Sequence, residues 1–149
     1  MLGELSPAAI ESLLHTQWVA RIGCHASRLT YVVPISYAYD GRAIYGHSAE
    51  GLKLEMLRAN PDVCVEVDHA DDVANWESVI AWGRYEELEG EAAEEALRLL
   101  LSRFRPLMTP ATGDGAHGTV PSAHGEGGAP LAAVYRIVLE DKSGRFERH

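Results

Sequence analysis

Apolar and polar residues alternate with a period of two in several short segments of this chain. The clearest run extends from Thr30 to Asp40, where every second residue from Tyr31 onward is apolar or aromatic. Residues 62–69 alternate in the same way and place three valines on one face. This period is typical of β-strands with one buried face. Similar segments bring the expected number of strands to six; they are 17–26, 42–48, 76–88 and 132–140.

Three other segments show the spacing of amphipathic helices. Ser6 and Pro7 precede an apolar stripe, and serine as a cap followed by proline at the first helical position is typical of a helix start. Residues 50–60 and 91–104 carry apolar residues at helical intervals, and the first of these segments ends before Pro61. The sequence therefore predicts three helices among the strands.

Residues 106–130 are rich in Gly, Pro, Ala and His, and we expect them to form a long mobile loop. The G-x-G-x-x-G pattern at 113–118 lies inside this segment rather than between a strand and a helix, so it does not indicate a dinucleotide site. The expected fold is mainly β (α+β): a single domain over residues 1–149 whose strands close into a β-barrel with short flanking helices. An open α+β sandwich is the alternative. A turn at 142–145 is expected to lead into a short tail strand.

Charge and cysteine content exclude several classes of function. The formal net charge is −9 and the chain has no cluster of Lys or Arg, which argues against binding to nucleic acid or to an anionic membrane. No segment approaches the roughly 20 apolar residues of a membrane-spanning helix. Cys24 and Cys64 lie in strand-like runs without C-x-x-C spacing, which favours a reducing, cytoplasmic location. The histidines lack metal-ligand spacing, so we expect no metal site.

One junction in the sequence is suited to an anion. A strand is expected to end at His47-Ser48, and a helix begins two or three residues later. The N–H groups of a first helical turn have no partner within the helix and attract anions. Lys53 is close enough in sequence to bring its ammonium group to the same point, and Ser48 can either cap the helix or donate its hydroxyl to a phosphate. Pro34 removes a backbone donor from its strand and therefore indicates an edge, a bulge or an interruption.

Three segments carry the most specific information: 31–41 (YVVPISYAYDG), 44–67 (IYGHSAEGLKLEMLRANPDVCVEV) and 76–84 (WESVIAWGR). In order and spacing they resemble the pyridoxamine 5′-phosphate oxidase-like FMN-binding split barrels, particularly small members related to nitroimidazole reductases. The resemblance extends over residues 6–140 apart from the long loop. It implies a six-stranded split β-barrel that binds FMN at the interface of a homodimer.

The resemblance also implies which residues contact the cofactor. The junction would hold the FMN phosphate through Lys53, with His47 and Ser48 as neighbouring donors. The strand around Pro34 would lie along the isoalloxazine ring, and Trp76 would begin a strand that approaches the flavin of the partner subunit. The matching positions are Val33, Pro34, Ile35, Ser36, His47, Ser48, Leu52, Lys53, Trp76 and Ser78.

Vitamin-B6 oxidases place Ser-Arg-Lys where this chain has Gly51-Leu52-Lys53, preceded by Glu50. The hydroxyl and the guanidinium group are therefore missing here, and a negative charge lies nearby. Vitamin-B6 phosphate oxidation is also disfavoured because the chain lacks a further Lys/Arg set for the second phosphate of that substrate.

The expected function is an FMN-dependent oxidoreductase that transfers a hydride or electrons between a nicotinamide or organic reductant and a small organic substrate. No side chain is assigned as catalytic; the best single candidate is His47. One alternative is a non-enzymatic flavin-binding or sensing protein. Another is a split barrel that uses haem or a deazaflavin instead of FMN.

Overall fold

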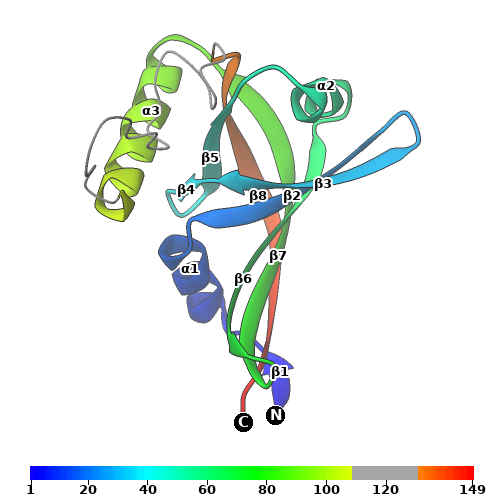
Figure 1. Ribbon diagram of the computed structural model, residues 1–149, viewed down its shortest axis with the longest axis vertical. Helices are drawn as coiled ribbons and strands as arrows, with labels where there is room; N and C mark the ends of the chain where they lie inside the picture. Colours follow the sequence, from blue (N-terminus) through cyan, green and yellow to red (C-terminus); the bar gives the residue numbers. More distant parts are fainter. Residues whose placement is uncertain (109–130) are drawn as a thin grey trace, which may run out of the picture.

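The computed structural model describes residues 1–108 and 131–149, and within them helices flank one antiparallel sheet (Figure 1). The expected loop 106–130 lies largely outside the described residues. The six longer strands correspond to the six that the alternation predicts; one short strand is added before α1, and the predicted strand 30–40 is divided into a long and a short strand. In chain order the elements are β1 (Leu2–Glu4), α1 (Pro7–Thr16), β2 (Val19–Ala26), β3 (Leu29–Ser36), β4 (Ala38–Tyr39), β5 (Ala43–Ser48), α2 (Leu52–Ala59), β6 (Asp62–Asp72), β7 (Asn75–Leu88), α3 (Gly90–Phe104), a 3₁₀ turn (Arg105–Leu107) and β8 (Ala133–Glu147).

Tyr37 closes the sheet into a barrel. The strand order is β3-β2-β6-β7-β8-β5-β4, with β1 paired to β8. The two strands at the ends of this order, β3 and β4, are consecutive in the chain and are separated only by Tyr37. The expected single strand from Thr30 to Asp40 is therefore interrupted, and the chain at the interruption links both ends of the sheet. The barrel is confirmed, and the alternative of an open sandwich is wrong.

The long strands β7 and β8 bend together at Gly83. Their register shifts between Trp82 and Gly83. A Cβ atom on Gly83 would lie 2.3 Å from the carbonyl oxygen of Val138, so only glycine allows this close approach. The turn expected at 142–145 is wrong, because β8 continues through it to Glu147, paired with β7.

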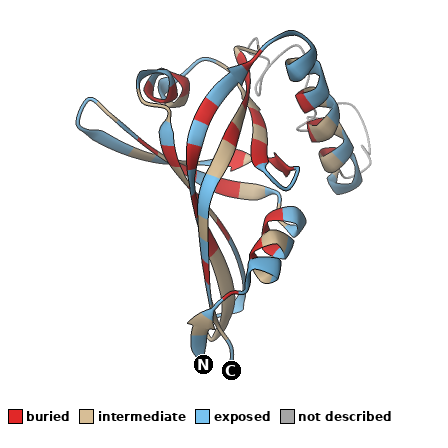
Figure 2. Cartoon of the chain, turned by 180° about the vertical axis from the view of Figure 1, so that it is seen from behind, coloured by how far each residue is buried: buried red, intermediate tan, exposed pale blue. Residues whose placement is uncertain are grey.

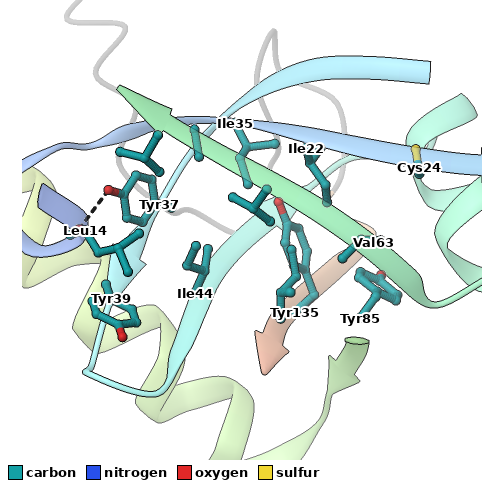
Figure 3. Close-up of a cluster of buried hydrophobic side chains, with 14 of the residues drawn as sticks. Leu14, Ile22, Cys24, Ile35, Tyr37, Tyr39, Ile44, Val63, Tyr85 and Tyr135 are labelled. Carbon is teal, nitrogen blue, oxygen red and sulfur yellow. Dashed lines mark hydrogen bonds between the residues drawn. The ribbon is translucent and has the colours of Figure 1, made fainter. Parts of the chain in front are cut away.

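The interior of the barrel is apolar, and a buried hydrogen bond ties it to helix α1 (Figures 2 and 3). The alternating valines of β6 are buried as predicted. Tyr37 is fully buried, and its hydroxyl donates a hydrogen bond of 2.8 Å to the carbonyl oxygen of Leu14 in α1. Helix α1 starts as predicted, with Ser6 Oγ accepting from the backbone N–H of Ala9. Trp18 and Trp82 are exposed in the single chain, so neither lies in the core.

Helices α2 and α3 lie near the same end of the barrel, where Figure 1 shows them on opposite sides of the sheet. Leu100 and Phe104 of α3 are buried together with Ala38 of β4. Helix α2 follows β5 after a three-residue turn and contacts β2. In residues 1–108 and 131–149, no helix is both long enough and apolar enough to cross a membrane.

Candidate functional site: a pocket at the strand-to-helix junction

A pocket of about 510 Å³ lies between strand β3 and the junction of β5 with α2. It brings together eight of the ten positions that the resemblance assigns to the cofactor, and it leaves out Trp76 and Ser78. The residues that line it are Val19, Tyr31, Val33, Pro34, Ile35, Ser36, His47, Ser48, Ala49, Glu50, Gly51, Leu52 and Lys53.

The start of α2 faces this pocket without a side-chain cap. The first backbone hydrogen bond of the helix runs from Glu55 N to Gly51 O at 3.2 Å. Ser48, expected as a possible cap, instead donates its hydroxyl to the carbonyl oxygen of Ala49 at 2.8 Å, and Gly51 at the cap position has no side chain. No side chain therefore caps the first turn of α2, and the first turn of a helix attracts anions.

Lys53 supplies the positive charge among the pocket-lining residues. Its Nζ lies 6.0 Å from the centroid of the Tyr135 ring, which is fully buried in β8. A Cβ atom on Gly46 would lie 2.5 Å from Tyr135 Oη, so glycine at 46 makes room for this ring. Burial raises the pKa of the nearby Cys24 thiol despite the positive charge of Lys53, so this cysteine stays a protonated core residue.

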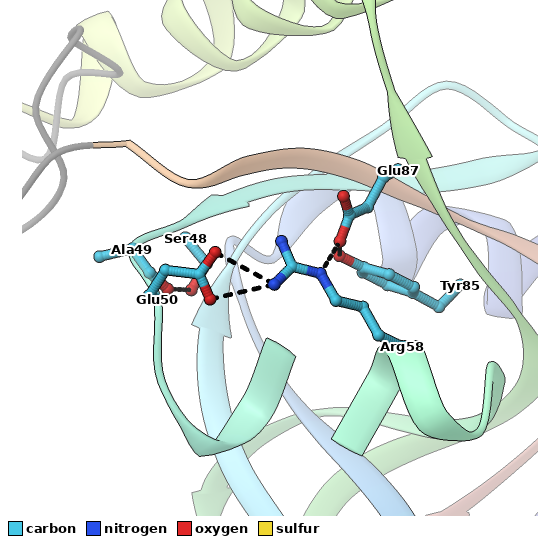
Figure 4. Close-up of polar contacts among 6 residues, drawn as sticks. All are labelled: Ser48, Ala49, Glu50, Arg58, Tyr85 and Glu87. Carbon is cyan, nitrogen blue, oxygen red and sulfur yellow. Dashed lines mark hydrogen bonds and ion pairs between the residues drawn. The ribbon is translucent and has the colours of Figure 1, made fainter. Parts of the chain in front are cut away.

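A second cation, Arg58, neutralises the acidic residue of the pocket (Figure 4). Arg58 Nη1 lies 3.0 Å from both carboxylate oxygens of Glu50, and its Nε donates to Glu87 of β7. Tyr85 donates its hydroxyl to the same Glu87 oxygen at 2.9 Å. The hydrogen bond from Arg58 holds the pKa of Glu87 below its ordinary value, so Glu87 stays ionised beside the guanidinium group. Sequence analysis missed Arg58, because its partner in β7 is distant along the chain.

Strand β3 presents an open edge to the pocket. Within the described residues it pairs only with β2, and Pro34 lies opposite Arg21. Proline is tolerated on an edge strand, so the prediction that Pro34 marks an edge is confirmed. An edge strand exposes backbone donors and acceptors that no neighbouring strand uses. These groups can bind the polar rim of a flat ligand.

Trp76 and Ser78 lie on strand β7, apart from the pocket of their own chain. The indole N–H of Trp76 donates to Glu147 at 3.2 Å, beside a separate pocket of about 330 Å³ near the chain ends. Ser78 donates its hydroxyl to Glu66 Oε1 at 3.0 Å. One chain therefore does not bring these two residues to the candidate site.

The part of the chain that the structure describes contains no group of three or more His, Cys, Asp or Glu side chains placed to hold a metal ion. The chemistry of the pocket instead combines one ammonium group, backbone donors and an apolar wall. This combination is suited to an organic ligand that carries an anionic group.

Comparisons with known proteins show the fold and the family of this chain. A FAD-binding protein from Mesorhizobium loti is 31% identical, covers 98% of each chain and superposes with a TM-score of 0.72. The FAD binding protein from Mycobacterium smegmatis is 25% identical, covers 99% of each chain and has a TM-score of 0.68. Uncharacterized protein RA0666 of Rhizobium meliloti (strain 1021) is 37% identical over 70 residues; this match spans 47% of the chain and 46% of that relative, about half its length. The family model described as pyridoxamine 5′-phosphate oxidase matches residues 6–146, and the chain belongs to this family.

Proposed function

We propose that this chain is a flavoprotein that holds FMN in the pocket between β3 and α2 and acts as an oxidoreductase. One observation carries the proposal: Lys53 and the uncapped start of α2 lie in the same pocket as the open edge of β3. A phosphate needs the first two features, and a flat heteroaromatic ring needs the third.

The residues present fit such a group. A volume of about 510 Å³ is within the range of small-molecule sites. Val33 and Leu52 contribute apolar surface, and Lys53 contributes a charge-assisted donor to a phosphate oxygen. The negative charge of Glu50 is offset near the proposed phosphate site, because this carboxylate is already paired with Arg58.

The chain's own contribution would be binding and orientation. A bound flavin supplies the redox chemistry itself, accepting and donating a hydride or single electrons. The β3 edge would orient the ring, and the apolar wall would keep water from one of its faces. His47 is the next-to-last residue of β5 and lines the pocket. It is our candidate for the polar side chain nearest the reacting atoms.

We further propose that a second copy of the chain completes the site. Val32 and Trp82 lie in one cross-strand row, with Gly23 and Cys64 between them. Val32 is 64% exposed and Trp82 is 44% exposed, so this row forms an uncovered apolar stripe. Trp76 and Ser78 share the outward face of β7 with Trp82, because side chains alternate along a strand. A partner packed on this face would bring its own Trp76 and Ser78 toward the neighbouring pocket.

The test of the flavin site is an absorption spectrum followed by titration. Protein purified in the dark should show absorption bands at about 370 and 450 nm. FMN added to the protein should bind, and its fluorescence should be quenched. FAD, which the Mesorhizobium loti relative binds according to its name, is titrated in parallel to decide between the two nucleotides. An intense Soret band, or a single band near about 420 nm, would instead indicate haem or a deazaflavin. A chain that takes up none of these groups overturns the proposal.

Lys53→Ala tests the phosphate assignment. Losing a charge-assisted hydrogen bond costs about 1.5–3 kcal/mol, so FMN affinity should fall about 10- to 150-fold. Arg98→Ala on α3, an exposed arginine in an ion pair with Glu94, is the matched control and should bind FMN as wild type. Equal affinity of Lys53→Ala and wild type would remove the phosphate from this junction.

Two measurements test the remaining parts of the proposal. Oxidation of NADH or reduction of a nitroaromatic compound above the rate of the same amount of unbound FMN supports the oxidoreductase; no turnover favours a flavin-binding or sensing protein.

Light scattering should give twice the mass of one chain, and Trp82→Glu should lower the measured mass to that of one chain. Val73→Glu, at an exposed apolar residue in the β6–β7 turn, is the control that should remain dimeric. A wild-type monomer would overturn the proposed dimer.

A further inference from the structure

We infer that Arg58 is a positioning residue for the anion-binding end of the pocket: it masks the charge of Glu50 and fixes the turn that leads into α2. This inference rests on the proposed function, since it concerns the phosphate of the bound flavin nucleotide. Arg58 does not line the pocket, so it would act through Glu50 rather than by touching the ligand.

The geometry shows one guanidinium group bridging two carboxylates from separate parts of the fold (Figure 4). Nη1 holds both oxygens of Glu50, in the turn between β5 and α2. Nε holds Glu87, near the end of β7, where Tyr85 supplies a further hydrogen bond. Because α2 carries Arg58 in its last turn, the helix, the turn before it and strand β7 are joined at one point.

The charge balance of the pocket explains why this bridge matters. Lys53 and Glu50 are the lysine and the carboxylate among the lining residues, and their charges would cancel for an approaching phosphate. With Arg58 in place, the carboxylate of Glu50 is paired with a guanidinium group and opposes a phosphate less strongly. Removing Arg58 would leave a largely exposed carboxylate beside a dianion, and like charges a few ångströms apart in a water-like dielectric weaken binding on the order of tenfold.

Exposure of the two side chains predicts how the effect depends on salt. Arg58 is 40% exposed and Glu50 is 63% exposed, so mobile ions reach both groups. The Debye length shrinks from about 10 Å at 0.1 M salt to about 3 Å at 1 M. The penalty of losing Arg58 should therefore be largest at low salt and shrink at 1 M. If Arg58 only held the fold together, the loss of FMN affinity caused by removing Arg58 would not shrink with salt in this way.

A double-mutant cycle with two ligands tests the inference. Arg58→Gln, Glu50→Gln and the double variant are titrated with FMN (or FAD, if that is the nucleotide bound by wild type) and with riboflavin, which lacks the phosphate. Arg58→Gln should bind FMN about tenfold more weakly and riboflavin within twofold of wild type. Adding Glu50→Gln should restore most of the FMN affinity, and Arg58→Lys should keep it. Arg98→Gln is the control for loss of an exposed arginine.

Each outcome has a definite meaning. Equal loss of FMN and riboflavin affinity in Arg58→Gln, without rescue by Glu50→Gln, overturns the inference and leaves Arg58 as a structural bridge. If Arg58→Gln does not fold, Glu50→Gln alone decides. Because Arg58 already masks Glu50 in wild type, Glu50→Gln should bind FMN within about threefold of wild type with riboflavin unchanged. A gain in FMN affinity of about tenfold or more would show that the Glu50 charge reaches the phosphate despite Arg58, and it refutes the inference. A wild-type chain that binds no flavin overturns the proposed function first, whereas wild-type binding with an unaffected Arg58→Gln overturns the inference alone.

Discussion

The point at which the barrel closes offers a sharp test of how the fold is held together. Tyr37 lies between β3 and β4, and its hydroxyl donates to the carbonyl oxygen of Leu14 at 2.8 Å. Leu14 is in the last turn of α1, whose carbonyl groups have no partner within the helix. Both residues are almost fully buried, so water does not replace the contact. Burial raises the pKa of Tyr37, so its hydroxyl is a protonated donor at neutral pH.

Tyr37→Phe removes this donor and leaves the ring in place. The change leaves a buried carbonyl oxygen without its partner, which costs about 1–3 kcal/mol of folding free energy. In a chain of this length each kcal/mol shifts the melting temperature by about 2–4 °C, so a decrease of about 2–12 °C is expected. The m value of urea unfolding should stay the same, because the variant exposes the same surface on unfolding.

Urea and thermal unfolding followed by circular dichroism measure this difference, and Tyr45→Phe is the matched control. Tyr45 donates its hydroxyl to Asp40 at 2.9 Å, at a position where water can replace the contact. The control should therefore lose less than about 0.5–1 kcal/mol. Equal stability of Tyr37→Phe and Tyr45→Phe would refute the reasoning that the buried contact with α1 stabilises the closure.

Two further predictions concern the pocket and the sheet. Gly51→Ser combined with Leu52→Arg restores the groups found in vitamin-B6 oxidases. Both side chains fit, because a Cβ atom on Gly51 meets nothing within 4 Å and Leu52 is 43% exposed. FMN affinity should therefore rise about two- to tenfold in a fluorescence titration. Unchanged affinity would place the phosphate elsewhere. Burial raises the pKa of Glu11, but hydrogen bonds from Lys142 and Tyr39 outweigh burial and bring it below its ordinary value of 4.5. Wild type should therefore have a larger free energy of unfolding than Glu11→Gln at pH 7, and this difference should disappear as the pH falls below 4.5. Unfolding measured at a series of acidic pH values tests this expectation. A difference that does not depend on pH would contradict the role of this ion pair.

Local patterns were sufficient where the physical cause is local. The alternation of valines in β6 and the Ser6-Pro7 helix start depend on neighbouring residues, and both predictions are confirmed. The junction from His47 to Lys53 was likewise recognisable, because a strand end, a short turn and a helix start follow one another along the chain. The structure places these residues around one pocket.

Other features depend on which strands pair, and local patterns failed there. The turn expected at 142–145 does not form, since Lys142 and Gly144 pair with Ala81 and Val79 of β7 and the sheet hydrogen bonds outweigh the local turn preference. Ser48 turns its hydroxyl to Ala49 instead of capping α2. Nothing along the chain connects Arg58 to Glu87.

The sequence by itself determined the six longer strands, the helices and the family, and it predicted an anion site at the junction of β5 and α2, because periodicity and motif spacing act over a few residues. Only the tertiary structure decided that the chain at Tyr37 closes the barrel, that β3 is an edge facing the pocket and that Arg58 neutralises Glu50. These features require residues far apart in sequence to meet, and the energy that selects such contacts comes from burying the whole apolar interior at once.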